Sequence, residues 1–177
     1  METWSDSRIV YDGHVVRLRV GEVILDDGAP AYREVVEHKG GVCIVPCDGN
    51  TVTLVRQFRI AIGNYVLEAP AGKIESDEDP AWRATCELEE ETGFRAGQVI
   101  PAGFAYASVG YCTEKIFLFL ALDLMPVPRN LDPEERIELV QVPLADVPGL
   151  LARNEIPDAK TIIVLHALLG HLGIASR

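Results

Sequence analysis

The sequence predicts an α+β domain with a mixed β-sheet, and three observations support this fold class. The chain of 177 residues is long enough for one sizeable domain. Its composition, with 48% hydrophobic and 24% charged residues, is that of an ordinary globular protein. Short β-rich segments run along the chain and are interrupted by two or three segments with helical patterning, which is typical of α+β domains.

The first 37 residues are strongly β-rich and predict a small subsidiary sheet. A strand over residues 14–25 leads through the turn Asp26-Asp27-Gly28 into a second strand over residues 32–37, and the two form a hairpin. An isolated hairpin is only marginally stable and cannot bury both of its faces. We therefore expect a β-hairpin region over residues 1–38 that packs against a second copy of the chain in a homodimer, followed by a main domain over residues 39–177.

The main domain begins with a series of predicted strands. Residues 41–46 form a short apolar strand, and the turn Asp48-Gly49-Asn50 leads into a strand over residues 51–57. A short strand over residues 65–68 ends at the turn Pro70-Ala71-Gly72. Later strands are expected at residues 98–106, 116–124 and 137–142.

A helix with well-marked ends is expected next. Asp79 is a good N-cap, Pro80 fits the first helical position, and Gly93 fits the position just past the end. Its inward-facing stripe consists of Ala81, Ala84, Thr85 and Leu88. Two further helices are predicted at residues 143–153 and 158–172, the second capped by Asp158.

Three carboxylates gather on another side of the first helix. Glu87, Glu90 and Glu91 lie side by side because positions i, i+3 and i+4 share a helical face. Carboxylates so close repel one another unless a cation lies between them. Hard divalent ions such as Mg²⁺ bind oxygen ligands of this kind and retain sites for water and phosphate oxygens. The segment therefore predicts a metal-phosphate site.

The same segment resembles the Nudix box, G-x5-E-x7-R-E-U-x-E-E-x-G-U, where U is apolar. Eight of the nine fixed positions fit at the right spacing: Gly72, Glu78, Glu87, Leu88, Glu90, Glu91, Gly93 and Phe94. The surrounding motifs RQFR, LEAPAGKIE, YREVVEH and DAKT, and the pair Glu114-Lys115, are similar to the ADP-ribose pyrophosphatase branch. The resemblance covers roughly residues 8–170.

This resemblance implies a Nudix α/β/α sandwich that hydrolyses the diphosphate bond of ADP-ribose or a related nucleoside diphosphate sugar. It implies Mg²⁺ as cofactor, with Mn²⁺ as the alternative. Glu87 and Glu91 would be the main metal ligands, with Glu90 assisting and the carbonyl of Ala71 completing the set. The metals would neutralise the diphosphate and orient the attacking water.

The resemblance also implies roles for residues outside the box. Glu135, next to Glu134 in a late loop, is the best match for the general base, and Glu90 is the second catalytic carboxylate. Arg56 suits phosphate binding, because a guanidinium matches phosphate oxygens in pairs. The remaining positions that resemble substrate-binding residues are Arg33, Glu34 and Glu114.

Two departures from the family pattern bear on activity. Cys86 replaces the box arginine, which in relatives helps to hold the glutamates in place. Arg83 lies one turn before Glu87 and projects between Glu87 and Glu90, so that it can take over part of this role. Val109 stands where the ADP-ribose branch usually carries a proline. Two alternatives therefore stay open: a different nucleoside diphosphate-linked substrate, or a non-catalytic module that senses ADP-ribose.

Charge and composition exclude other classes of partner. A net charge of −11 opposes nucleic-acid binding, which needs a basic surface. The sequence has no apolar run of the roughly 20 residues that cross a membrane, and the N-terminus has no signal-peptide pattern. We expect a cytoplasmic protein that binds a small nucleotide, with Cys43, Cys47, Cys86 and Cys112 as free thiols.

Overall fold

A computed structural model describes residues 1–75 and 77–174, which fall into two compact units. The first unit, called here the N-terminal unit, comprises Met1–Gly40 and Tyr106–Lys115. The second, called the main unit, comprises Gly41–Ala105 and the chain from Ile116 onward. The expected division of roles between residues 1–38 and 39–177 stays a prediction.

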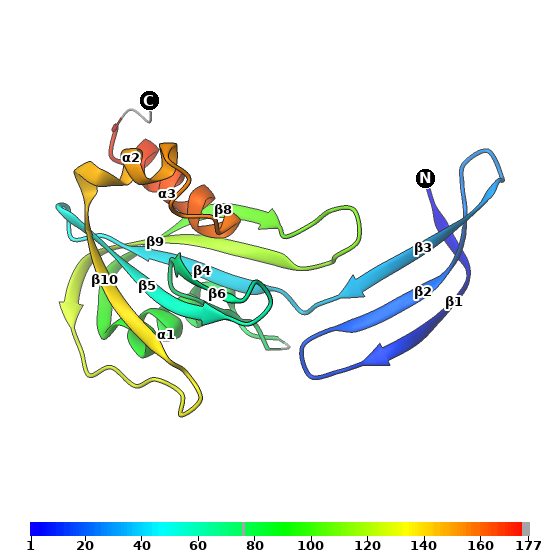
Figure 1. The fold of residues 1–177 in the computed structure, drawn as a ribbon, viewed down its shortest axis with the longest axis horizontal. Helices are drawn as coiled ribbons and strands as arrows, with labels where there is room; N and C mark the ends of the chain where they lie inside the picture. Colours follow the sequence, from blue (N-terminus) through cyan, green and yellow to red (C-terminus); the bar gives the residue numbers. More distant parts are fainter. Residues whose placement is uncertain (76, 175–177) are drawn as a thin grey trace. The chain divides into compact units, whose positions relative to one another are not determined.

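The N-terminal unit is built on a three-stranded antiparallel sheet in the order β1-β2-β3 (Figure 1). The strands are β1 (Thr3–Asp12), β2 (Arg17–Ile24) and β3 (Pro30–Glu37). The β2-β3 hairpin is the predicted one, whereas β1 was not predicted. Because most of its side chains are exposed, β1 lacks the alternation of apolar and polar residues that identifies a half-buried strand.

Close pairing with β2 holds β1 in place. A Cβ atom at Gly21 of β2 would lie 2.1 Å from the carbonyl oxygen of Asp6, a distance that no side chain tolerates. The glycine therefore permits the backbone of β1 to approach, at a point where the register between the strands shifts. Pairing of this kind leaves no pattern in the sequence of β1 itself.

A distant segment completes the N-terminal unit. The amide of Val36 donates to the carbonyl of Tyr111 over 2.7 Å, and the amide of Thr113 donates to the carbonyl of Val36 over 2.9 Å. The amide of His38 donates to the Thr113 hydroxyl over 2.9 Å. Residues 106–115 thus extend the edge of β3, although about 70 residues separate the two segments in the sequence.

The main unit contains two sheets. One has the order β7-β4-β9-β8 and the other the order β10-β5-β6. Figure 1 labels these strands except β7. Strand β4 pairs parallel with β9 and antiparallel with β7, so the first sheet is mixed, as predicted. The strand bounds are β4 (Gly41–Pro46), β5 (Thr51–Arg59), β6 (Asn64–Glu68), β7 (Ala71–Lys73), β8 (Phe94–Tyr106), β9 (Lys115–Pro126) and β10 (Ile137–Pro143).

Strand β4 is buried along its whole length and contributes to two apolar clusters. Cys43 and Val45 belong to the cluster that includes side chains of β5 and α3, whereas Val42 and Ile44 belong to the cluster that includes those of α1. Alternate side chains of a strand point to opposite faces, so both faces of this sheet are covered. This arrangement is the α/β/α sandwich that the sequence predicts.

The helices begin and end close to the predicted residues. Helix α1 (Pro80–Thr92) is capped by Asp79, whose side chain accepts from the amide of Trp82, and it ends at Gly93 with φ of 71°. A 3₁₀ turn, η1 (Leu144–Asp146), leads into α2 (Val147–Ala152). Helix α3 (Ala159–His171) is capped by Asp158. None of the helices within the described residues is both long enough and apolar enough to cross a membrane.

Candidate active site

Two of the three carboxylates on the acidic face of α1 are buried, whereas Glu90 is partly exposed. The exposed fraction is 5% for Glu87 and 4% for Glu91, close to the values for the core residues of the same helix. Ala71 and Gly72, which the sequence placed in a turn, instead begin strand β7, and this strand lies against the helix. A Cβ atom at Gly72 would lie 1.4 Å from Glu87 Oε1. Only a residue without a side chain fits beside Glu87, which explains the physical need for glycine at position 72.

Strand β7 also contacts Glu91 directly. The amide of Ala71 donates to Glu91 Oε2 over 3.1 Å, so the start of β7 is tied to the last turn of α1. The resemblance implies a role for the carbonyl of Ala71, and the structure adds this contact of its amide. Ala71, Glu87 and Glu91 are therefore brought together at one place in the main unit.

Burial changes the acidity of these carboxyls. It raises the pKa of Glu91 to about 8, with the charge of Glu87 adding to the effect and the Ala71 amide acting against it. Burial also raises the pKa of Glu87, although the neighbouring Arg83 opposes the rise. The negative charge of Glu135 contributes to both shifts, which places it within electrostatic reach of the pair.

Arg83 supplies the positive charge on this face. Its Nη2 atom lies 2.5 Å from Glu87 Oε1 and 3.3 Å from Glu90 Oε2, as the helical spacing predicts. Cys86 is a half-buried free thiol. Burial, followed by the charge of Glu90, raises the pKa of the Cys86 thiol, so it does not replace the arginine of the box as a charged group.

The donors of this cluster suit a hard divalent cation. Two neighbouring carboxylates that are both buried and ionised raise the free energy of the folded state. A bound divalent ion would relieve their repulsion. Within the described residues, no three His, Cys, Asp or Glu side chains are close enough to form a metal site. Glu87 instead pairs with Arg83, and Glu91 accepts from the Ala71 amide.

Glu135 lies in the loop of residues 127–136 between β9 and β10. Its amide donates to the carbonyl of Asp132 over 2.9 Å, and its Oε2 atom accepts from the amide of Asp132 over 3.2 Å. The carboxylate therefore caps its own turn, an exposed contact that a small rotation of the side chain would release.

Arg56 contacts residues other than the carboxylates of α1. Its Nη1 atom lies 3.3 Å from Glu138 Oε2 across the β5-β10 pair, and its guanidinium lies 4.6 Å from the centre of the Tyr65 ring. Both members of the ion pair are about half exposed or more. An exposed pair of this kind is weak, so a phosphate could compete for the guanidinium.

The other three predicted substrate residues lie in the N-terminal unit. Arg33 pairs with Glu2 over 2.7 Å, and Glu34 lies opposite Val20 in the β2-β3 register. Glu114 lies 3.8 Å from His38 Nδ1. They thus come from two segments of the same unit, β3 and residues 106–115.

A buried polar network at the start of α3 was not predicted. Lys160 Nζ lies 2.6 Å from Glu68 Oε2 and 3.0 Å from Asp158 Oδ1. Arg59 donates to both oxygens of Glu68, over 2.6 and 2.9 Å. The Thr161 hydroxyl accepts from the amide of Ala69 over 2.7 Å. The network therefore fixes Glu68 and Ala69, which lie just before β7.

The signals for this network were present in the sequence. The motifs LEAPAGKIE and DAKT contain Glu68, Lys160 and Thr161, but they lie about 90 residues apart and their spacing alone does not show that they meet. The pairing follows only from the packing of α3 against the sheet, where Val164 and Leu165 join the core cluster.

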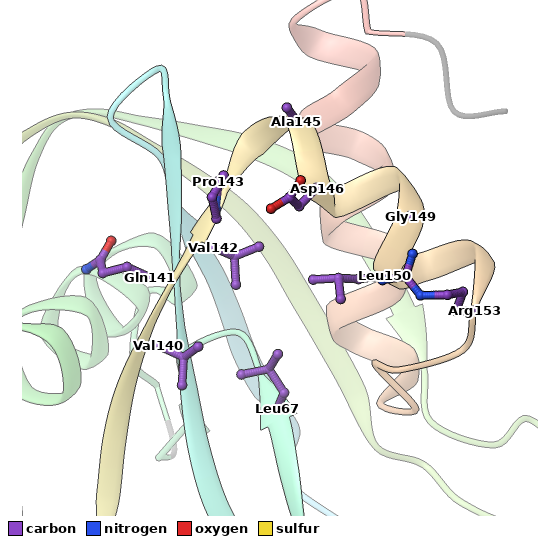
Figure 2. A pocket seen from close by; sticks show the side chains of 10 residues that line it. All are labelled: Leu67, Val140, Gln141, Val142, Pro143, Ala145, Asp146, Gly149, Leu150 and Arg153. Atoms are coloured by element: carbon purple, nitrogen blue, oxygen red, sulfur yellow. The ribbon is translucent and has the colours of Figure 1, made fainter.

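An open hollow of about 590 Å³ lies elsewhere, between β10 and α2 (Figure 2). Apolar side chains such as Leu67, Val140 and Leu150 line it, with Asp146 and Arg153 at α2. It includes none of the predicted site residues. The hollow is therefore distinct from the carboxylate cluster of α1.

Comparison with known proteins gives a consistent result. A family model described as NUDIX domain matches residues 37–164. The chain is 36% identical over 162 residues to an ADP-ribose pyrophosphatase of Bacillus subtilis, covering 90% of this chain and 88% of the relative. It is 33% identical to the methanol dehydrogenase activator of Bacillus methanolicus, again over 90% and 88%.

Two further likenesses bear on substrate and fold. A GDP-mannose pyrophosphatase of Citrobacter koseri is 33% identical over 147 residues, covering 77% of this chain and 76% of that protein. The solved structure of an ADP compounds hydrolase superposes with a TM-score of 0.86 at 23% identity, over 98% of this chain and 97% of the other. This structural likeness confirms the predicted fold.

Proposed function

The chain belongs to the Nudix family, and we propose that it hydrolyses the diphosphate bond of ADP-ribose or a related nucleoside diphosphate sugar. From ADP-ribose the products would be AMP and ribose 5-phosphate. The observation that carries this proposal is the buried pair Glu87 and Glu91 on α1, which Ala71 and Gly72 of β7 contact. The ADP-ribose and GDP-mannose pyrophosphatases among its relatives support the substrate class.

We propose that Glu87, Glu90, Glu91 and the carbonyl of Ala71 hold a divalent cation, Mg²⁺ or Mn²⁺. Such an ion neutralises diphosphate charge and orients water when it is bound. The burial of Glu87 and Glu91 supports this assignment, because Arg83 alone can balance only one of the two buried negative charges. Arg83 would keep Glu90 and Glu87 in one geometry.

The proposed catalytic groups are Glu135 and Glu90. Glu135 would accept the proton of the attacking water, for which its electrostatic coupling to Glu87 and Glu91 is the supporting observation. Arg56 would bind a phosphate oxygen in place of Glu138. Arg33 and Glu34 would bind the nucleoside end of the substrate, and Glu114 would also contact the substrate.

We further propose that the protein works as a homodimer in the cytoplasm. Trp4, Tyr11 and Tyr32 are exposed on the strands of the N-terminal unit, and a second copy could cover such rings. All four cysteines, Cys43, Cys47, Cys86 and Cys112, are free, which is typical of a reducing compartment.

A second substrate is favoured by one observation. Val109, where the ADP-ribose branch usually has a proline, is 87% exposed in the segment of residues 106–115. A turn without proline is less constrained, and GDP-mannose pyrophosphatases are among the relatives. GDP-mannose or another nucleoside diphosphate sugar is therefore the alternative substrate.

A substrate panel tests the proposal. The purified protein would be incubated with ADP-ribose, GDP-mannose, other nucleoside diphosphate sugars and dinucleotides, with Mg²⁺, Mn²⁺ or a chelator. Phosphate released after coupling to a phosphatase measures cleavage. We expect metal-dependent release from at least one diphosphate sugar. Binding of ADP-ribose without release from any compound would instead identify a sensor.

A further inference from the structure

The loop of residues 127–136 closes against the C-terminal end of α1. The amide of Val127 donates to the carbonyl of Gly93 over 2.8 Å. The amide of Asn130 donates to the carbonyl of Glu90 over 3.3 Å. Arg129 Nε donates to the carbonyl of Glu91 over 2.5 Å. The last carbonyls of a helix have no partners within the helix, and here the loop supplies them. A cation near this end also suits the helix dipole.

The same arginine side chain reaches the far end of the loop. Arg129 Nη2 donates to the carbonyl of Ile137 over 3.0 Å, and Ile137 is the first residue of β10. Arg129 therefore bridges the helix end and the start of the strand. Residues 130–136, which contain Glu134 and Glu135, form a loop whose two ends are joined by one side chain.

The fit of the loop at its base is close. A Cβ atom at Gly93 would lie 3.1 Å from the carbonyl oxygen of Val127 and 3.3 Å from Cβ of Arg129. The left-handed φ of 71° at Gly93 ends the helix and makes room for this approach. The glycine that terminates α1 thus also sets the distance between α1 and Arg129.

We propose that Arg129 is a positioning residue for Glu135. By joining the carbonyls of Glu91 and Ile137, it holds residues 130–136 so that the Glu135 carboxylate stays within reach of water beside Glu87 and Glu91. The effect of Arg129 on catalysis rests on the proposed hydrolase function. A planar guanidinium suits this task, because its fixed donors bind two acceptors at a defined angle, whereas a lysine ammonium does not.

Removing the Arg129 bridge should change mainly the conformational freedom of the loop. Without Arg129, the ends of residues 130–136 separate more freely and the segment gains conformational entropy. Glu135 lies two residues before Ile137, so its carboxylate would sample positions away from Glu87 and Glu91. Misplacement of a catalytic group by about 1 Å can lower a rate by about 100-fold.

Kinetics of matched variants would test this proposal. We expect Arg129→Met to lower kcat by about tenfold to 100-fold with little change in KM, and Arg129→Lys to recover only part of the loss. The double variant Arg129→Met/Glu135→Gln should be about as slow as Glu135→Gln alone, because both act through one group. Full multiplication of the two losses, or natural activity in Arg129→Met, would overturn the proposal.

Arg95→Met is the matched control. Arg95 also lies just after α1 and pairs with Glu89 over 2.6 Å, so its removal deletes a cation from the same helix end without touching the loop. We expect it to retain kcat within about twofold, as for an exposed ion pair. A loss equal to that of Arg129→Met would show that charge at the helix end, and not the bridge, sets the rate.

Amide hydrogen exchange gives a readout that needs no turnover. Arg129→Met should lose protection at Asn130 and Glu135, whose amides donate to Glu90 and Asp132, while α3 stays protected. Unchanged exchange in residues 130–136 would refute the bridge even where activity falls. If the natural protein hydrolyses no diphosphate, the proposed function fails, and the exchange measurement still decides whether Arg129 fixes the loop.

Discussion

Arg83 Nη2 lies 2.5 Å from Glu87 Oε1, one turn further along α1. The same nitrogen is 3.3 Å from Glu90 Oε2, so one guanidinium joins two of the three carboxylates of the acidic face. Cys86 occupies the box position where an arginine is usual, and its thiol carries no compensating charge. The charge expected at position 86 is therefore supplied from the preceding turn.

Removal of the Glu91 carboxylate should abolish most of the activity. We expect Glu91→Gln to lower kcat by at least about 100-fold, because it removes a ligand and a charge from the proposed metal site. Steady-state kinetics at saturating Mg²⁺ measure the effect. Glu89→Gln is the control, since Glu89 lies on the same helix but pairs with the exposed Arg95. Retention of activity within a few-fold in Glu91→Gln would refute the assignment.

Cys86→Arg should raise kcat or the affinity for metal. A second guanidinium would hold the carboxylates in one geometry, as the box arginine does in relatives. Arg83→Met should act in the opposite direction, because Glu87 and Glu90 lose their shared partner. Activity measured at increasing Mg²⁺ concentrations separates a change in kcat from a change in metal affinity. Loss of activity in Cys86→Arg would show that the helix is packed around the thiol.

The Glu68 network should stabilise the fold at neutral pH. Glu68 is 3% exposed, and Glu68→Gln leaves Arg59 and Lys160 without their carboxylate partner. We expect a loss of about 3 kcal/mol in the free energy of unfolding at pH 7, at the lower end for a buried pair because Lys160 keeps Asp158. Denaturant unfolding at pH 7 measures the loss. Glu155→Gln, which breaks the exposed pair with Arg153, is the control and should change little.

The same network predicts the direction of the pH dependence. Burial alone raises the pKa of Glu68, but the hydrogen bond from Arg59 and the charge of Lys160 outweigh it, so the pKa lies below the ordinary 4.5. A lowered pKa in the folded state stabilises the protein above pH 4.5, and this contribution is lost as the pH falls through the folded pKa. The difference in stability between the natural protein and Glu68→Gln should therefore shrink on acidification. A constant difference from pH 7 to pH 3 would exclude the ion pairs as its source.

The natural protein should be a homodimer in solution. The exposed rings of Trp4, Tyr11 and Tyr32 in the N-terminal unit are the motive, together with the small size of its sheet. Light scattering at micromolar concentration should give about twice the chain mass of 19.4 kDa. A monomer over the whole concentration range would contradict the proposal.

Local signals predicted the ends of α1 and α3. Asp79 and Asp158 accept the expected capping hydrogen bonds, and Gly93 adopts the left-handed conformation that ends a helix. Each of these depends on a few neighbouring residues, so the sequence contains the whole cause. The burial of Glu87 and Glu91 could not be predicted in this way, because it depends on β7, which contacts α1 only in the folded chain.

The missed features have causes that lie far apart in the sequence. Strand β1 depends on the glycine at position 21 in its partner, and β7 has only three residues, which is too short for a pattern. Arg129 lies in a proline-rich loop, and the sequence around it gives no sign of a structural role. Arg129 donates to two backbone carbonyls, those of Glu91 and Ile137. Every residue has a backbone carbonyl, so the sequence cannot show which carbonyls are the acceptors.

The pairing of residues 106–115 with β3 limits how this protein can be divided. The chain passes from one unit to the other three times, after Gly40, Ala105 and Lys115. Deleting the first 40 residues would strip the backbone partners from Tyr111 and Thr113 and leave an unpaired edge in the middle of the chain. The N-terminal unit therefore cannot be exchanged as one continuous segment of the chain. Recombination with another hydrolase would preserve both units only if it transferred two separate stretches of sequence at once.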